Sequence, residues 1–382
     1  MNALERPVIS KWKLQRELAR LRTQVAAIPA LISQPFVQWR YDKRRAEIVK
    51  IKPGGVPCGE NVVIYLIFQP NGVSESVLET CKYLNDSGFS PIVISNSQLS
   101  SDDETAIATN AYLVVQRPNY GYDFGGYRDG VWLLNARGIA PKALVFLNDS
   151  VWFPAVKNTN MLSRLIDSPD DYVGTQVFGD ISKIGKRRGF FGSYCFCIKS
   201  PVWKSDEFQS FWKNYQNISN KEVTLRRGER AFSRLMLSVF GGSCLYSQGQ
   251  FESLIATLTP AELKQAVQDM VVTDPNLEAK RSAITKQGLD KVAEKEMKAL
   301  ILASARSKNY IAAAPILCVA KLGFPMIKKN KERHYILARK RILQAVDEGR
   351  LTNISSLVVN EMRDKNHANS LGLTCNFKTK RA

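Results

Sequence analysis

The sequence predicts an α/β protein with a mostly parallel central sheet that is covered by helices on both faces. Apolar runs bounded by turn residues are typical of strands buried on both sides, and the chain has four of them, at residues 61–68, 91–96, 112–116 and 144–147. Apolar residues at helical spacing lie between these runs, at 77–84 and 129–136. Strands that alternate with helices over short connections favour a parallel sheet.

Further elements are expected beyond the fourth strand. Two more strands are predicted at 172–178 and 193–198, and helices at 161–166, 226–239 and 332–347. The basic segment Lys183–Gly189 between the two strands is predicted to be a loop.

The net charge of +19 is concentrated at the two ends of the chain. Residues 1–57 hold 12 Lys and Arg against 4 Asp and Glu, and residues 321–382 hold 14 against 5, whereas the residues between them are close to neutral. We therefore predict three parts: a basic helical N-terminal arm at 1–57, a globular domain at 58–330 and a basic helical C-terminal tail at 331–382.

Basic ends on a near-neutral core favour docking to an anionic membrane surface, because each Lys or Arg near the headgroups contributes roughly 1 kcal/mol. A nucleic-acid enzyme would more often carry its positive charge around the active face of the core, so no nucleic-acid partner is expected. Solvated basic helices without a partner are the simpler alternative.

The N-terminal arm contains an amphipathic pattern after Ser10, which is a suitable helix cap. Lys and Arg fill most positions around the apolar ones, and Pro29 and Pro35 are expected to end the helix. Such a helix suits a membrane interface, and it suits packing on its own domain or on a partner helix almost equally well. The apolar positions are Leu14, Leu18, Leu21, Val25 and Ile28.

The remaining composition favours a cytoplasmic protein that binds the inner face of the membrane peripherally. Residues 1–25 lack the apolar core of a signal peptide, and no window of 18 apolar residues predicts a membrane span. The seven cysteines are odd in number and show no CxxC spacing, which is typical of a reducing compartment. Both histidines lie near the C-terminus, which counts against histidine-based hydrolysis and zinc sites.

The first candidate site is the polar triplet Asn148-Asp149-Ser150, which follows the fourth predicted strand directly. Ligands gather at the carboxyl ends of parallel strands, and a carboxylate there could hold Mg²⁺ or Mn²⁺ against a diphosphate. Asp149 is therefore a candidate metal ligand, and the alternative is that it caps a turn.

The second candidate is the glycine-rich stretch Arg117–Gly130, which leads into a predicted helix. Glycines permit close backbone approach to a ligand, and helix N-termini bind anions. The spacing is neither GxGxxG nor a P-loop, so Rossmann dehydrogenases and P-loop NTPases are disfavoured. The candidate donor-binding residues, with those of the triplet, are Arg117, Asn119, Gly121, Asp123, Arg128, Asn148 and Asp149.

The third candidate is Glu229, which stands among Arg226, Arg227 and Arg230 at the start of a predicted helix. A carboxylate in such surroundings could act as a general base on a hydroxyl. A surface cluster of ion pairs is at least as plausible from the sequence alone.

Several of these segments resemble the rhamnan synthesis protein F family, which consists of glycosyltransferases of bacterial surface polysaccharide assembly. The resemblance covers roughly residues 60–330, and its most specific parts are Asn119-Tyr-Gly-Tyr-Asp-Phe-Gly125 and Leu147-Asn-Asp-Ser-Val151. It continues through Gly192-Ser-Tyr194, Phe208-Gln-Ser-Phe-Trp212, Gly228-Glu229 and Gly323-Phe-Pro-Met-Ile-Lys328.

The resemblance implies a GT-A-like nucleotide-sugar-binding fold and transfer of rhamnose or a related hexose to a lipid-linked glycan of an O-antigen, rhamnan or capsule. It also implies that Glu229 occupies the position of the catalytic base and that the stretch around Asp123 and Asp149 holds the donor. GT-A enzymes carry an Asp-x-Asp motif where this chain has Asn148-Asp149-Ser150, so the triplet offers one carboxylate, not two, to Mg²⁺ or Mn²⁺. The alternative function is that of a non-catalytic, membrane-docked scaffold in a polysaccharide assembly complex.

Overall fold

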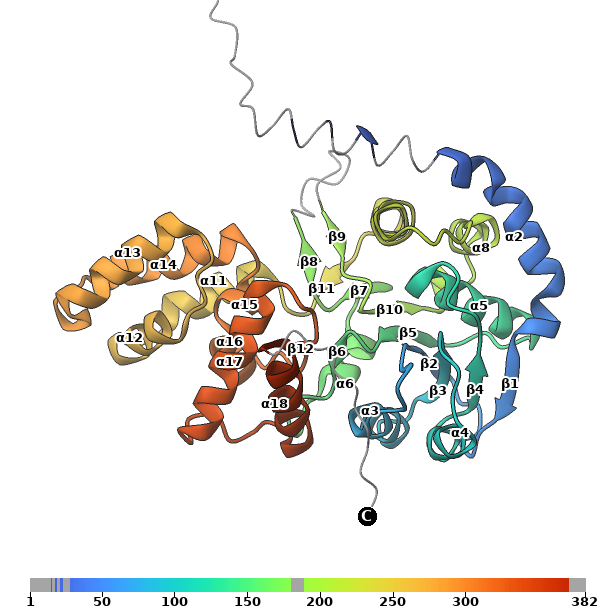
Figure 1. Cartoon of the computed structure of the whole chain (residues 1–382), viewed down its shortest axis with the longest axis horizontal. Helices are drawn as coiled ribbons and strands as arrows, with labels where there is room; N and C mark the ends of the chain where they lie inside the picture. Colours follow the sequence, from blue (N-terminus) through green and yellow to red (C-terminus); the bar gives the residue numbers. More distant parts are fainter. Residues whose placement is uncertain (1–14, 16–17, 19–20, 23–27, 180–188, 371–382) are drawn as a thin grey trace, which may run out of the picture.

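The computed structural model contains an eight-stranded sheet, and the predicted α/β class with a mostly parallel sheet is confirmed (Figure 1). The structure describes the chain except residues 1–14, 16–17, 19–20, 23–27, 180–188 and 371–382. The strand order is β1-β4-β3-β2-β5-β10-β7-β11. The four strands predicted first form the parallel centre: β2 (Asn61–Ile67), β3 (Ser90–Ser95), β4 (Leu113–Gln116) and β5 (Ala143–Asn148).

Antiparallel strands extend this centre on both sides. On one side β1 (Lys50–Pro53), which lies in the predicted N-terminal arm, pairs with β4. On the other side β10 (Cys195–Lys199) lies between β5 and β7 (Tyr172–Gly174), and β11 (Ser243–Cys244) follows. The single strand predicted at 172–178 is divided, because β8 (Val177–Phe178) leaves the sheet and pairs with β9 (Phe190–Phe191).

The sheet buries two apolar faces, as the alternation of side chains along a strand requires. One face, with Val63 and Tyr65 of β2, packs on α3 (Glu75–Asp86), α4 (Ser101–Ala108) and α6 (Met161–Asp167). The other face, with Val62 and Ile64, packs on α5 (Tyr122–Ala136), α7 (Ser200–Trp203), α8 (Asp206–Asn214) and α10 (Ala231–Phe240). Figure 1 shows α5 and α8 on the opposite side of the sheet from α3 and α4.

Helix α5 begins at Tyr122, whereas the sequence predicted a helix from Asp129 onwards. The glycines that indicated a loop are inside the helix and allow it to lie close to β2. A Cβ atom on Gly126 would stand 2.1 Å from Leu66 Cδ1. The prediction was wrong because the glycines were interpreted as permitting close approach to a ligand, whereas Gly126 permits close approach of α5 to β2.

Helix α2 (Ile28–Ile48) continues through Pro35, so the prediction that the prolines end a helix there was wrong. Tertiary contacts along one side of α2 outweigh the missing backbone hydrogen bond. These contacts reach the glycine-rich stretch at Tyr120 and Asp129. The amphipathic pattern between Ser10 and Val25 falls almost entirely outside the described residues.

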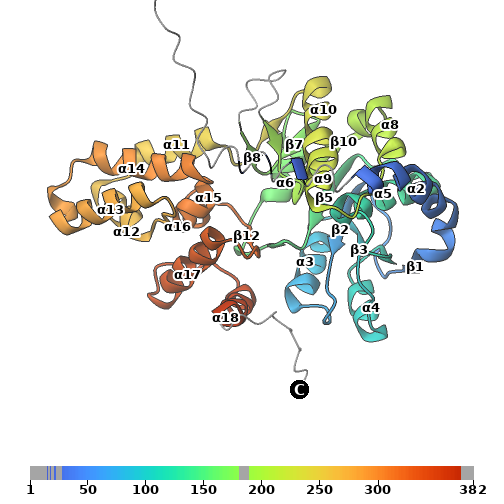
Figure 2. The ribbon, with the colours of Figure 1, turned by 45° about the horizontal axis from the view of Figure 1, so that its top comes forward.

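A helical lobe follows the sheet and leads back to it (Figures 1 and 2). It consists of α11 (Gln248–Thr257), α12 (Pro260–Asp269), α13 (Pro275–Gln287), α14 (Glu294–Ser307), α15 (Tyr310–Ala313) and α16 (Pro315–Ala320). The chain then forms β12 (Ile327–Lys328), which pairs with β6 (Val151–Trp152) directly after the polar triplet.

The last two described helices, α17 (Arg333–Asp347) and α18 (Ser356–Ser370), pack on the core. Together with Trp152 and Ile327 they form a third apolar cluster that includes Ile342 and Met362. Glu361 of α18 accepts hydrogen bonds from Trp152 Nε1 (2.7 Å) and from the backbone and hydroxyl of Ser76. The described part of segment 331–382 is therefore bound to the strand that follows the candidate site.

None of the described helices has the length and apolar character needed to cross a membrane.

Candidate active site

The order of the strands places the first candidate site at a reversal of the topology. The chain passes from β2 outwards to β3 and β4, and then returns to place β5 on the other side of β2. In open α/β sheets, the crevice outside the carboxyl ends of strands at such a reversal is where ligands bind. Phe68 follows β2 and Asp149 follows β5, so both lie at this crevice.

The Asp149 carboxylate joins the ends of these two strands. Its Oδ2 accepts hydrogen bonds from Phe68 N (2.8 Å) and from Gln69 Nε2 (2.6 Å). Burial raises the pKa of Asp149, while Lys329 and these hydrogen bonds act in the opposite direction. Asp149 is therefore a positioned acidic group rather than a freely solvated one.

Asn148 connects the triplet to the glycine-rich stretch. The Asn148 side chain is buried and donates from Nδ2 to Asp123 Oδ2 at 2.9 Å, and its Oδ1 accepts from the Ser150 hydroxyl at 2.6 Å. Burial first, and then the negative charges of Asp149 and Glu229, raise the pKa of Asp123 to about 6, against the lowering effect of Lys328 and Lys221. The first two predicted sites are therefore one site.

The turn before Asp123 has an unusual backbone. Gly121 has φ 84°, and a Cβ atom there would stand 2.7 Å from Asn217 Cβ. Tyr122 follows with φ 50°, which is uncommon for a residue other than glycine. Non-glycine residues held in this region occur where the surrounding structure fixes them, and functional sites are enriched in them.

The two predicted donor-binding arginines are engaged by the protein. The Arg117 side chain is 0% exposed; it contacts Asp129 Oδ2 and Asn96 Oδ1, each at 2.6 Å. Arg128 donates to both carboxylate oxygens of Asp42, at 2.6 and 2.9 Å. Both guanidinium groups hold the glycine-rich stretch in place, whereas Asn119 is exposed on its surface.

Helix α2 also holds the glycine-rich stretch in place, and the sequence analysis did not predict these contacts. We call Arg117, Asp129 and Tyr41, which join the two segments, the clamp. Tyr41 donates to Asp129 Oδ2 at 2.5 Å, and Gln34 bonds the Tyr120 hydroxyl and the Asn217 carbonyl. The signal was present as polar residues at helical spacing, since Gln34, Gln38 and Asp42 lie on one stripe of α2. The N-terminal arm is therefore part of the site's support.

Glu229 lies on a cavity of about 260 Å³ beside Asp123. Its Oε1 accepts a hydrogen bond from Ser193 N at 2.7 Å, which orients the carboxylate. Glu229 belongs to a π-helical segment, Leu225–Arg230, and such segments are frequent at functional sites. The cavity is lined by Tyr122, Asp123, Phe124, Ser193, Lys221, Thr224, Leu225 and Glu229.

The surroundings of Glu229 differ from those the sequence indicated. Arg226 and Arg227 are exposed, and the Arg230 guanidinium lies over the Phe190 ring at 5.4 Å. Within the described ranges none of the three forms an ion pair with Glu229. The basic loop predicted at 183–189 falls outside the described residues except for Gly189.

Two lysines from β12 and the residue after it complete the site. Lys328 pairs with Val151 in the sheet register, and Lys329 N donates to Ser150 O at 2.8 Å. Burial lowers the pKa of Lys328 to about 7, against the attraction of Glu229 and Asp123. Burial also lowers the pKa of Lys329, which faces Asp149 and Glu361. Nothing in the sequence connected these lysines with the triplet, because the two segments are far apart in the chain.

The described side chains are a poor fit for Mg²⁺ or Mn²⁺. They include no group of three His, Cys, Asp or Glu residues that could hold a metal ion. Asp149 Oδ2 already accepts two hydrogen bonds, and the positive charges of Lys329 and Lys365 act on the carboxylate. The assignment of Asp149 as a metal ligand stays a prediction, and no catalytic step is derived through a metal.

The glycine-rich stretch, the triplet and Glu229 all fall in a segment that is similar to a known family. The family model of rhamnan synthesis protein F matches residues 91–277. This match confirms the resemblance predicted from the sequence.

A relative and two solved structures are also similar to the chain. "Uncharacterized protein y4gN" of Sinorhizobium fredii is 28% identical over 370 residues, which cover 94% of this chain and 93% of that protein. Core-mannan synthase A of Aspergillus fumigatus, in its Mn/GDP form, is 10% identical with a TM-score of 0.28, over 50% of this chain and 73% of its own. The mannosyltransferase PcManGT of Pyrobaculum calidifontis, in complex with GDP-Man and Mn²⁺, is 12% identical with a TM-score of 0.25. The similarity covers 94% of this chain and 98% of that protein's chain.

Proposed function

We propose that the chain is a glycosyltransferase that moves a sugar, rhamnose or a related hexose, from a nucleotide-sugar donor to a lipid-linked glycan of a bacterial surface polysaccharide. The observation that carries the proposal is the convergence of Asp123, Asn148 and Asp149 at the topological reversal, with Asp123 and Glu229 lining one cavity. The match to rhamnan synthesis protein F supports the same reaction class.

The proposed reaction divides the site into two parts. The backbone around Gly121, together with Asn119, Asp123 and Asp149, holds the nucleotide-sugar. Glu229 accepts the proton of the acceptor hydroxyl, whose oxygen forms a bond to the anomeric carbon of the sugar. The bond from that carbon to the diphosphate breaks, and its electron pair leaves with the nucleoside diphosphate. Arg117 and Arg128 act as positioning residues for the turn.

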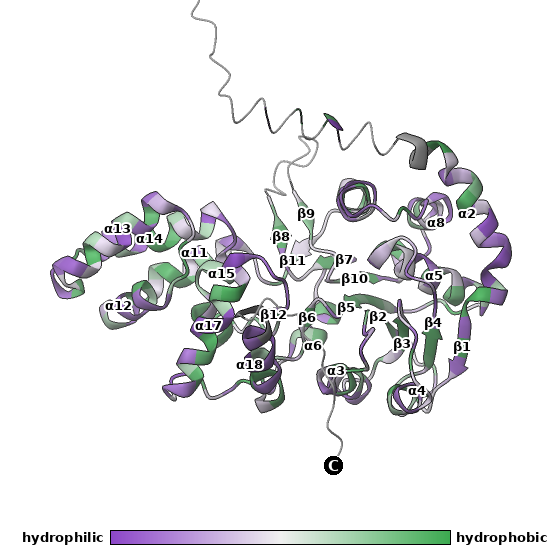
Figure 3. Cartoon of the chain, viewed as in Figure 1, coloured by the Kyte–Doolittle hydropathy of each residue, from purple (hydrophilic) through white to green (hydrophobic). Residues whose placement is uncertain are grey.

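The acceptor side of the proposal places the protein at the cytoplasmic face of the membrane. The outer side of α2 supports this location, because Ile32, Phe36 and Trp39 are 77%, 63% and 56% exposed. Arg40, Lys43 and Arg44 are exposed on the same helix, and Figure 3 shows hydrophobic and hydrophilic residues together along it. Aromatic and basic residues on one helix are typical of proteins that bind anionic lipid surfaces.

A thermal-shift panel with UDP, GDP, dTDP and CMP tests the proposal first. A ligand present at 100 times its dissociation constant stabilises a protein by about 2.7 kcal/mol, so the donor's nucleotide should raise the melting temperature visibly. The matching nucleotide-sugar should then be consumed when a lipid-linked acceptor is added. Binding of a nucleotide without turnover of any donor would favour the scaffold, and binding of none would refute the transferase.

A further inference from the structure

Lys328 is a cation in the site to which neither the sequence analysis nor the proposed reaction assigns a role. It reaches the triplet from the other end of the chain, because β12 pairs with β6 immediately after Ser150. The three carboxylates of Asp123, Asp149 and Glu229 lie around the same crevice. Lys328 lies close enough to Asp123 and Glu229 for their negative charges to act on it.

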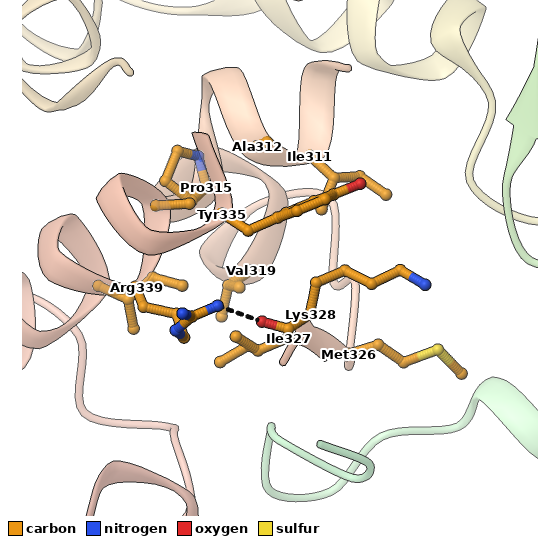
Figure 4. Close-up of a pocket in the computed structure, with 11 residues that line it drawn as sticks. Ile311, Ala312, Pro315, Val319, Met326, Ile327, Lys328, Tyr335 and Arg339 are labelled. Atoms are coloured by element: carbon orange, nitrogen blue, oxygen red, sulfur yellow. Dashed lines mark hydrogen bonds between the residues drawn. The ribbon is translucent and has the colours of Figure 1, made fainter. Parts of the chain in front are cut away.

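The backbone of Lys328 is fixed by a buried arginine. Arg339 is 0% exposed, and its Nη1 donates to Lys328 O at 2.8 Å and to Asn330 O at 2.9 Å. Its Nε donates to Asn366 Oδ1 of α18 at 3.1 Å. Figure 4 shows the Lys328 side chain pointing away from Arg339 while its carbonyl oxygen accepts the hydrogen bond. The helices α17 and α18 therefore hold β12 in a set position.

The ammonium group of Lys328 is held against the protein without an ion-pair partner. Its Nζ lies 3.3 Å from the centre of the Tyr194 ring, a cation–π contact. In the described part of the chain, no carboxylate oxygen lies within ion-pair distance of it, although Asp123 and Glu229 attract it at longer range. A half-buried ammonium of this kind has donor hydrogens to offer to a ligand.

Lys329 adds a second positive charge on the same segment. Its Nζ lies 5.3 Å from the centre of the Trp152 ring, and it faces the carboxylates of Asp149 and Glu361. Glu361 is already satisfied by Trp152 and Ser76. Lys329 therefore offsets the charge of Asp149, which would otherwise repel an anionic ligand.

We propose that Lys328, assisted by Lys329, binds the diphosphate of the nucleotide-sugar donor and supplies the positive charge that a divalent cation would otherwise supply. The proposal rests on the glycosyltransferase function above. As the bond between the anomeric carbon and the diphosphate breaks, the leaving oxygen gains negative charge, and the fixed ammonium stabilises it. Lysine is a point-charge binder of phosphate with three rotatable donors, which suits this task.

The opposing interpretation is that Lys328 only neutralises Asp123 and Glu229. That role would act through the two carboxylates, so binding of the diphosphate by Lys328→Met would recover at least in part when Glu229 is also changed to Gln. Direct contact between Lys328 and the diphosphate predicts no such recovery, so the double variant separates the two interpretations.

The test uses the whole chain in EDTA and measures the binding of UDP, GDP and dTDP and of the corresponding nucleosides by calorimetry. Lys328→Met should weaken binding of the nucleoside diphosphate by about 10- to 100-fold and leave binding of the nucleoside unchanged. Lys328→Arg should recover part of the loss. Lys331→Met, at an exposed lysine three residues away, is the matched control and should bind as the wild type does.

Circular dichroism and the melting temperature establish whether each variant is folded. If Lys328→Met does not fold, the affinity of Lys328→Arg for the diphosphate is compared with that of the wild type instead. Diphosphate binding in EDTA that is equal in wild type and Lys328→Met overturns the inference and leaves the transferase intact. Wild-type binding that requires Mn²⁺, and that survives Lys328→Met, overturns it as well. Failure of the wild type to bind any of the nucleotides under either condition refutes the proposed function itself.

Discussion

Asp149 and Phe68 are joined across two neighbouring parallel strands, with Asp149 Oδ2 2.8 Å from the backbone nitrogen of Phe68. This hydrogen bond fixes the carboxyl end of β5 against that of β2, at the point where the topology reverses. One oxygen of Asp149 is occupied by this hydrogen bond, so the residue fixes the positions of the two strand ends and also supplies negative charge to the crevice. The Gln69 side chain donates to the same oxygen at 2.6 Å.

Replacement of Asp149 should therefore impair both nucleotide binding and the shape of the site. Asp149→Asn keeps an acceptor oxygen for Phe68 but loses the charge, and we expect sugar transfer to fall at least about 100-fold with little change in melting temperature. Asp149→Ala should also lose about 1–3 kcal/mol of stability, because two donors lose their acceptor. Full transfer activity in either variant would contradict the site assignment.

Glu229→Gln tests the general base. The glutamine can still accept the hydrogen bond from Ser193 N through its oxygen, so the fold and the binding of nucleotide should be retained. We expect the turnover number to fall about 10²- to 10⁴-fold, which is the usual contribution of a positioned base. Glu222→Gln, at an exposed glutamate on α9 (Lys221–Thr224), is the control and should turn over normally. Equal turnover in the two variants would remove Glu229 from the mechanism.

The sequence predicted the sheet better than it predicted the site. Four apolar runs with turn residues at their ends have one reasonable interpretation, and all four became the parallel centre. Asp123 and Asn148 could be placed near the ends of a helix and a strand. Their hydrogen bond could not be predicted, because it depends on α5 beginning at Tyr122, and the glycines in this segment indicated a later start. The position of Lys328 in the site could not be predicted, because it depends on the pairing of β12 with β6, on which local sequence patterns carry no information.

The raised pKa of Asp123 predicts that the free energy of unfolding depends on pH. Because the pKa is raised to about 6 from an ordinary value near 3.8, the stabilising effect of proton binding is present below pH 4 and is lost as the pH rises through 6. Asp123→Asn should therefore be more stable than the wild type above pH 6, by about 3 kcal/mol at most, and the difference should vanish below pH 4. Denaturant unfolding of both proteins at several pH values measures this. A difference that is constant with pH would show that Asp123 is not electrostatically strained.

The buried pair of Arg117 and Asp129 should matter for stability more than for chemistry. Their closest atoms are 2.6 Å apart, and Asp129 also accepts from Tyr41 of α2. Arg117→Met leaves Asp129 buried with less compensation, so we expect a loss of about 3–5 kcal/mol. Arg137→Met, at an exposed arginine after α5, should stay within about 0.5 kcal/mol of the wild type. If the two variants unfold at the same denaturant concentration, the clamp contributes little.

The outer side of α2 should bind anionic vesicles through its aromatic and basic residues. The rings of Phe36 and Trp39 are stacked with centroids 5.9 Å apart, and Lys43 Nζ lies 5.3 Å from the Trp39 ring, so apolar and cationic groups face outwards together. The double variant Phe36→Ser, Trp39→Ser should sediment less with vesicles containing phosphatidylserine, and salt should weaken binding of the wild type because screening reduces attraction to the headgroups. Val239→Ser removes an exposed apolar residue from α10 and should leave vesicle binding unchanged. Binding that is equal in all three proteins would assign membrane contact to a different surface, and wild-type binding to neutral vesicles at the same strength would exclude the basic residues as its cause.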